Sequence, residues 1–390
     1  MTAGHVRELL REANGLPLGA VRIAACEHVR GEAERVGDPV LIFDTLCDLA
    51  TAYGFGGGDP RRKIAAVAAM VSLMDTTPAL AGDHQRRRSL LWRLKWVTVS
   101  PLGYPEVPLD RVREMLDDMQ RRYLAAGEGL APVLRNRYRF SRTVHGPEAA
   151  HDDYLAWVRA PRTDLSDCAA CEHTSRVEQL ADLGHDEQAV HEALPVLDGR
   201  VSCTMEPERA IGYAMVPLLR TGRAERAAVE HLRAVANLVR KKPWRLVAVA
   251  EHISVCARVG RLDRGLKLVE AVLPLLDYDI EPHSRMLLAA HASRLLRALV
   301  ESGRADLPVH RGHPPRISSL SPLPQPVVPT STTAGALADL LTAEARSIAA
   351  RFGTRDGTTV AIDEVERILA ADPLPVLPLE RVSRAGRRTA

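Results

Sequence analysis

Four short segments recur at a fixed spacing along the middle of the chain, and they decide the fold. They are Thr143-Val-His-Gly-Pro-Glu-Ala-Ala150, Asp182-Leu-Gly-His-Asp-Glu-Gln-Ala189, Arg220-Thr-Gly-Arg-Ala-Glu-Arg-Ala227 and Arg258-Val-Gly-Arg-Leu-Asp-Arg-Gly265. The glycines at positions 146, 184, 222 and 260 lie 38 residues apart. Each glycine follows an apolar helical stretch and precedes an amphipathic one, which carries a small residue four or five positions after the glycine.

This pattern predicts stacked helical hairpins. Glycine in the left-handed conformation ends a helix, and an acidic residue near the next helix start suits the positive end of the helix dipole. One hairpin cannot bury its apolar face alone, whereas stacked neighbours can. The period lies between the about 34 residues of a tetratricopeptide (TPR) repeat and the about 40–47 residues of HEAT-type repeats. We therefore expect an all-α fold, a right-handed α-solenoid of stacked hairpins with the form of a TPR-like superhelix.

Periodicity and composition agree with an all-α fold. Apolar residues recur three or four positions apart within residues 21–36, 109–124 and 226–239, which is typical of helices packed against other helices. Strict alternation of polar and apolar residues is almost absent, and aromatic residues make up only 4% of the chain. Because strands of a sandwich or barrel draw on aromatic residues, this composition disfavours those folds.

The overall composition also limits location and partners. No apolar run approaches the roughly 18 residues that span a bilayer, and the first residues lack the apolar core of a secretory signal. We therefore expect a cytoplasmic protein with no membrane partner. The net charge of +3 is far from the clustered basic footprint of a nucleic-acid binder. Arginine supplies 47 of the 52 basic residues, a bias that indicates a GC-rich bacterial genome.

A proline-rich stretch sets the expected domain boundaries. Residues 304–333 contain seven prolines with serine and threonine between them, and proline blocks helices and favours an extended linker. We expect a TPR-like helical-repeat domain at residues 1–303, a Pro-rich linker at 304–333, a small C-terminal helical segment at 334–372 and a disordered basic tail at 373–390.

Three of the six cysteines form a candidate metal site. Cys168-x-x-Cys171 and Cys203 precede equivalent helices of adjacent repeats, so the loops that lead into those helices can meet. A Cys-x-x-Cys turn presents two thiolates to one tetrahedral Zn²⁺. Three interpretations stay open: a structural zinc ion that pins two repeats, three unligated thiols, or a redox Cys-x-x-Cys without its usual βαβ context.

A zinc ion at this site needs a fourth ligand. The expected set is Cys168, Cys171, Cys203 and His173, which lies two residues after Cys171. His231 and Asp167 are the alternatives. At a rise of about 1.5 Å per residue, His231 lies roughly 13 Å along its helix from the glycine turn at 222.

Several strings resemble a family of bacterial TPR-like proteins. They are Leu90-Leu-Trp-Arg-Leu-Lys-Trp96, Tyr104-Pro-Glu-Val-Pro-Leu109, Leu116-Asp-Asp-Met-Gln-Arg-Arg-Tyr123, Leu165-Ser-Asp-Cys-Ala-Ala-Cys171 with Cys203, and Phe352-Gly-Thr-Arg-Asp-Gly-Thr358. His231 also matches a histidine of that family. The resemblance covers residues 38–372 outside the linker, and Gly353 and Asp356 depart from the family's Phe-Asp-x-Arg-Asn-Gly. It implies a helical-repeat fold and a binding role, with no assigned reaction.

A TPR-like superhelix offers a concave groove lined by the first helix of each hairpin. Arg209, Tyr213 and Glu251 are the candidate partner-binding residues, and Tyr213 and Glu251 are 38 positions apart. We therefore expect a non-enzymatic protein-interaction scaffold or regulator that binds a peptide or a partner protein. The alternatives are a metal- or thiol-dependent enzyme that uses Cys168, Cys171 and Cys203, and a nucleic-acid-linked sensor.

Overall fold

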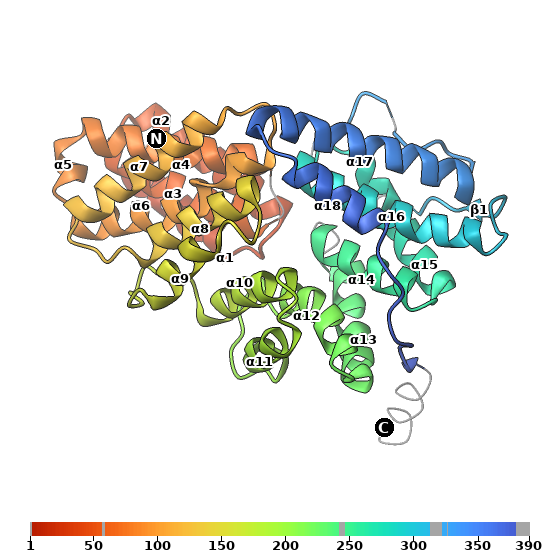
Figure 1. Ribbon diagram of the computed structural model, residues 1–390. Coiled ribbons are helices and arrows are strands. Elements are labelled where there is room, and N and C mark those ends of the chain that lie inside the picture. Colours follow the sequence, from red (N-terminus) through yellow and green to blue (C-terminus); the bar gives the residue numbers. More distant parts are fainter. Residues whose placement is uncertain (1, 57–58, 242–245, 313–321, 326, 380–390) are drawn as a thin grey trace, which may run out of the picture. The chain divides into compact units, whose positions relative to one another are not determined.

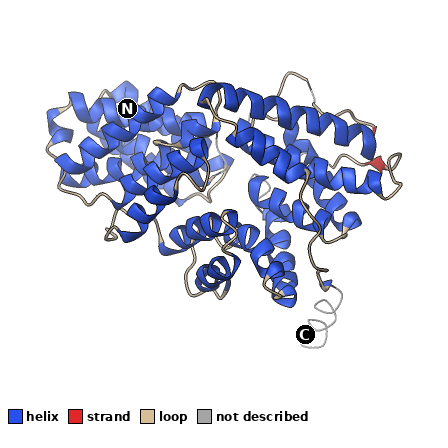
Figure 2. Ribbon diagram, viewed as in Figure 1, coloured by secondary structure: helices blue, strands red, loops and turns tan. Residues whose placement is uncertain are grey.

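The computed structural model describes all residues except 1, 57–58, 242–245, 313–321, 326 and 380–390. Almost all of its regular elements are α-helices (Figures 1 and 2), which confirms the predicted all-α class. The two short strands β1 (Pro308–Val309) and β2 (Thr332–Thr333) pair antiparallel. Within the described residues, none of the helices is at once long enough and apolar enough to cross a bilayer.

The helices group into two compact units. The described residues of Met1–Thr143 and Ala149–Ser166 form unit 1, and those of Val144–Glu148, Asp167–Pro315 and Pro322–Ala390 form unit 2. Stacked helices of one domain contact mainly their neighbours. The division into two units by residue contacts therefore does not test the predicted domain bounds. The bounds at residues 303, 333 and 372 stay a prediction.

Unit 1 is built of helices, and consecutive α-helices from the first to the seventh pack on one another. Side chains of the eighth and ninth share a hydrophobic cluster. Asp38-Pro39 and Asp59-Pro60 begin two of the helices: each aspartate accepts a hydrogen bond from a backbone N–H of the first turn, where proline needs no donor. The elements are α1 (Ala3–Gly15), α2 (Ala20–Val36), α3 (Pro39–Phe55), α4 (Pro60–Thr76), α5 (Pro78–Ala81), α6 (His84–Val97), the 3₁₀ helix η1 (Ser100–Gly103), α7 (Leu109–Ala125), α8 (Ala131–His145) and α9 (His151–Arg159).

Unit 2 contains the helices on either side of three of the four glycine turns. They are α10 (Ala169–Asp182), α11 (Asp186–Leu197), α12 (Glu208–Arg220), α13 (Ala224–Lys241), α14 (Leu246–Arg258), α15 (Leu262–Val272), the 3₁₀ helix η2 (Leu273–Asp277), α16 (Pro282–Glu301), α17 (Ala334–Asp356) and α18 (Val360–Leu369).

The glycine turns have the backbone conformation that the sequence predicts. Gly146, Gly184, Gly222 and Gly260 have φ values of 90°, 72°, 77° and 72°, in the left-handed region that glycine adopts without a steric penalty. Helices α10 and α11, α12 and α13, and α14 and α15 pack as pairs around the last three turns. The first helices of these pairs also pack on one another, α10 on α12 and α12 on α14, and α14 packs in turn on α16.

Close helix packing in unit 2 depends on a small residue after the turn. A Cβ atom added to Gly265 of α15 would lie 2.4 Å from Cδ1 of Leu295 on α16 and 2.9 Å from Cβ of Cys256 on α14. These separations are far shorter than van der Waals contact, so a larger residue here would push α15 away from its neighbours.

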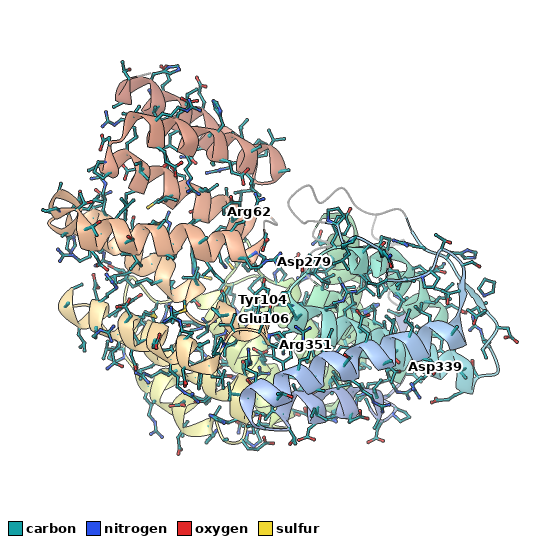
Figure 3. All side chains as sticks on the ribbon, turned by 90° about the horizontal axis from the view of Figure 1, so that it is seen from above. Arg62, Tyr104, Glu106, Asp279, Asp339 and Arg351 are labelled. Carbon is teal, nitrogen blue, oxygen red and sulfur yellow. The ribbon has the colours of Figure 1, made fainter. Side chains whose placement is uncertain are left out.

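The described segments after α16 belong to unit 2. Helix α17, with Asp339 near its start and Arg351 near its end in Figure 3, packs along α16, and α18 packs on both. Part of the expected Pro-rich linker also docks here, since the backbone N–H of Leu323 donates to the carbonyl of Asp277 at 2.7 Å. Because proline blocks a helix here, the N–H of Leu323 has no helical partner and bonds to a carbonyl of another segment.

The beginning of the expected disordered tail is held as well. The backbone N–H of Leu374 donates to the carbonyl of Arg258 at 2.8 Å, and the guanidinium of Arg261 donates to the carbonyl of Leu377 at 3.1 Å. Leu377 is fully buried, and burial of a leucine stabilises by about 1.5–3 kcal/mol. Residues 373–379 thus differ from the expectation of disorder, whereas residues 380–390 lie outside the described part of the chain.

Candidate functional site

Cys168, Cys171 and Cys203 meet at one end of the α10–α12 contact in unit 2. Their sulfur atoms all lie within 4.8 Å of one another, and the sulfurs of Cys171 and Cys203 are 3.5 Å apart. Cys168 is the residue before the first turn of α10, Cys171 lies in that turn, and Cys203 lies in the loop before α12. Because α10 packs on α12, the loop and the helix start are neighbours.

The contacts around the cluster favour a negative charge on the sulfur of Cys168, whereas the pKa values of Cys171 and Cys203 are raised. Hydrogen bonds from the thiols of Cys171 and Cys203, and from the backbone N–H groups of Cys171 and Ala170, hold the pKa of the Cys168 thiol well below its usual range. The hydrogen bond to Cys168 is also the main reason why the pKa of Cys171 is raised. The backbone N–H of Met205 points at the sulfur of Cys203, 3.3 Å away. Such N–H donors orient and stabilise thiolate ligands.

The spacing of the three sulfurs suits a metal ion. Two thiolates on a tetrahedral ion with bonds of about 2.3 Å lie about 3.8 Å apart. The observed separation of 3.5 Å, with all three sulfurs inside 4.8 Å, is close to that value. The cluster can therefore hold a metal ion without a large rearrangement of the backbone.

The structure does not bring the expected fourth ligands into this cluster. The Nδ1 atom of His173 lies 2.7 Å from a carboxylate oxygen of Glu192 on α11. His231 lies on α13, where its Nε2 accepts a hydrogen bond from Arg264 at 2.8 Å. Neither histidine nor Asp167 has a ligand atom in the three-sulfur group. His173 belongs to the same helix turn as Cys171, but α-helical residues two apart point to different sides.

Arg209 lies beside the sulfur cluster rather than on a separate surface. Its guanidinium is 3.4 Å from the carboxylate of Glu206, whose side chain is fully buried. Burial lowers the pKa of Arg209, but the nearby groups Glu206, Tyr213, Glu178 and Cys171 outweigh that effect and raise it. Arg209 therefore stays positively charged, and 28% of its side chain is exposed. It lies between the cysteines and the rest of the α12 face.

Tyr213 and Glu251 lie on neighbouring first helices, α12 and α14. A Cβ atom added to Gly212, next to Tyr213, would lie 3.3 Å from the Cβ of Glu251, so the two helices are in close contact at this level. Burial raises the pKa of Glu251 to about 8, and the negative charge of Asp182 adds to the increase. The Glu251 carboxyl thus keeps its proton at neutral pH and can donate a hydrogen bond.

One acidic residue of α10 links these candidate positions. Glu178 interacts electrostatically with Arg209 and also with Glu251. Arg209, Tyr213, Glu251 and Glu178 therefore form one polar surface across α10, α12 and α14, which we call the inner face. Helix α18 borders it, because Glu364 and Arg367 also interact with Glu251.

Sequence reasoning missed several of these residues. Glu206 lies in the loop before α12, so no helical spacing in the sequence links it to Arg209, and their ion pair appears only in the structure. Glu178, Glu364 and Arg367 carried no local signal, since they approach Glu251 only through the packing of different helices.

Comparisons of the chain with protein-family models and with curated proteins found no match.

Proposed function

We propose that the chain is a non-enzymatic protein-interaction scaffold or regulator, which binds a peptide or a partner protein on the inner face. In this proposal the helical hairpins continue as a right-handed, TPR-like solenoid, and the inner face is the floor of its groove. The observation that supports it most is the consecutive packing of α10, α12 and α14. That packing carries Arg209, Tyr213 and Glu251 on adjacent first helices. The proposed location is the cytoplasm.

The inner face offers the partner contrasting polar contacts. Arg209 supplies a fixed positive charge, and the protonated carboxyl of Glu251, whose pKa is about 8, supplies a donor. Glu178 supplies a negative charge. Hydrogen bonds to charged groups contribute about 1.5–3 kcal/mol each, so a segment of matching polarity is held in one register along the helices.

The test is capture of partners from the native host by the full-length protein, with identification by mass spectrometry. The variants Tyr213→Ala and Arg209→Ala should lose a partner that the wild type retains. Val229→Ala is the matched control, since Val229 is 45% exposed on the second helix α13. Circular dichroism must show that all variants are folded. Equal capture by wild type, Tyr213→Ala and Val229→Ala would reject the inner face as the binding surface.

The proposal includes one structural zinc ion at Cys168, Cys171 and Cys203. It would tie the loop before α12 to the start of α10, two segments that are 32 residues apart at the Cys171–Cys203 contact. Zinc suits three thiolates in a compact site. Enzymatic use of these cysteines is the alternative that we rank lower, because among the described residues no histidine or carboxylate atom joins the three sulfurs as a base.

Metal analysis of the purified protein tests the zinc ion. The wild type should contain close to one zinc per chain, and Cys203→Ser should lose the metal together with a lower melting temperature. Ser202→Ala is the control, since Ser202 is the exposed neighbour of Cys203. Wild-type protein that is free of zinc after purification under reducing conditions removes the ion from the proposal.

A further inference from the structure

We propose that the metal ion at Cys168, Cys171 and Cys203 keeps its fourth coordination position for a thiol that comes from outside the chain. This inference rests on the zinc ion of the proposed function and concerns what else that ion binds. It makes the cluster a thiol-binding site in addition to a connection between α10 and the loop before α12.

The chain supplies only three ligand atoms to the site among its described residues. Zinc in structural sites takes four ligands, whereas three protein ligands leave one position for another molecule. Within the described ranges, no further His, Cys, Asp or Glu atom belongs to the three-sulfur group. His173 is engaged by Glu192 at 2.7 Å, and His231 accepts from Arg264 at 2.8 Å.

The carboxylate of Glu206 is also engaged. Glu206 is close enough to Cys171 to affect its pKa electrostatically, which makes it the best remaining candidate for a protein ligand. One of its oxygens accepts a hydrogen bond from the backbone N–H of Ala210 at 3.1 Å. The other lies 3.4 Å from the guanidinium of Arg209. Moving the Oε1 atom of Glu206 onto the metal would give up its ion pair with Arg209.

The cluster is accessible from solvent. Cys168 is exposed, and Cys171 and Cys203 are each half-buried. The cluster therefore reaches solvent on the side of Cys168, and a small group can approach the metal there. A purely structural site is normally closed on all sides by its own four ligands.

The chemistry of the three sulfurs favours a thiol as the incoming ligand. A divalent ion with three thiolates carries a net charge of −1 and is a soft centre, which favours another sulfur donor over an oxygen donor. On binding, the S–H bond of the incoming thiol breaks, its proton goes to solvent, and the sulfur electron pair forms the bond to the metal. No atom changes its oxidation state. The guanidinium of Arg209, beside Cys171, offsets the added negative charge.

The test uses the full-length chain with cobalt(II) in place of zinc, because cobalt absorbs visible light according to its ligands. The probes are free cysteine, glutathione and a short cysteine-containing peptide, with serine and methionine as controls. We expect the intensity of the sulfur-to-cobalt absorption to increase with thiol concentration until it saturates. It should rise from the intensity typical of three thiolate ligands to that of four. One proton should be released per site, and serine should have no effect. A spectrum that saturating cysteine leaves unchanged overturns the proposal.

The variant His173→Ala separates the open position from a hidden protein ligand. If the position is open, this variant responds to cysteine just as the wild type does. A response that appears only after His173 is removed identifies His173 as the fourth ligand and overturns the proposal. Absence of the tetrahedral cobalt spectrum in both proteins means instead that the metal site itself has failed.

The three thiol probes distinguish the source of the ligand. Saturation by free cysteine and glutathione at the same concentration as by the peptide indicates a small cellular thiol. Saturation by the peptide at a concentration at least tenfold lower indicates a cysteine side chain of a protein partner. Both results support a thiol site.

Discussion

The imidazole rings of His231 and His252 meet inside unit 2 with their Nδ1 atoms 3.1 Å apart, and both side chains are completely buried. Arg264 donates a hydrogen bond to Nε2 of His231 at 2.8 Å. His231 therefore carries its proton on Nδ1 and donates it to His252, whose own proton is on Nε2. The tautomers of both rings are fixed only while both rings stay neutral.

This arrangement makes stability depend on pH. Burial lowers the pKa of His231 to about 2 and that of His252 to about 3, with the positive charge of Arg264 contributing to both. The unfolded chain binds protons near the ordinary histidine pKa of about 6.5, whereas the folded chain does not. The stability contributed by the neutral rings is thus complete above that pKa and is lost as the pH falls toward 3 and below.

Between pH 7.5 and 5.5, the free energy of unfolding should fall by about 1.4 kcal/mol for each of these histidines. His252→Gln should reduce the total loss by about that amount, because glutamine does not titrate. Urea unfolding of wild type and variant at the two pH values measures the difference. Parallel pH dependences in the two proteins would show that His252 is accessible to protons in the folded state.

Gly265→Ala should destabilise the protein by about 1–3 kcal/mol, because the new methyl group overlaps Leu295 and Cys256 and overpacks the core. Gly31→Ala is the matched control. Gly31 lies inside α2, with only the guanidinium of Arg35 at 4.0 Å from an added Cβ, and it should gain about 0.5–1 kcal/mol from helix propensity. Urea unfolding compares the two, and a loss of equal size in both variants would contradict the packing argument.

Gly222→Ala tests the glycine turn without any steric overlap. No atom lies within 4 Å of an added Cβ, yet φ is +77°, so the expected cost of about 1–2 kcal/mol comes from the backbone alone. Asparagine tolerates the left-handed region better, and Gly222→Asn should therefore cost less. Thermal unfolding of both variants gives the order, and an alanine variant as stable as wild type would refute it.

Lys95→Met should weaken unit 1. The Lys95 ammonium, with 3% of the residue exposed, donates to the carbonyls of Leu165 and Ser166 at 2.8 and 2.9 Å. It also lies 3.2 Å from the centre of the Trp92 ring. Methionine keeps the volume but removes the donor, which costs about 1–3 kcal/mol for a buried acceptor left unpaired. Hydrogen exchange should rise around residues 165–166, and unchanged protection there would contradict this role.

The helical class and the glycine turns could be predicted because they are local properties. Apolar spacing identifies a helix from one segment, and a turn such as Gly184-His185 needs a left-handed residue wherever it occurs. For Cys171 and Cys203, the sequence shows only that they precede neighbouring helices, so that their loops are able to meet. The fourth ligand could not be chosen, since the sequence does not show that His173 faces Glu192.

By itself, the sequence determined which segments become helices, where glycine ends them and that Cys168 and Cys171 have a Cys-x-x-Cys spacing. Tertiary structure alone decided that Arg209 lies beside Cys171, that Arg367 approaches Glu251, and that Leu377 is buried. The physical reason is the sequence separation over which each property is determined. Backbone conformation follows from neighbours within a few residues, whereas electrostatics and burial depend on side chains that only packing brings together.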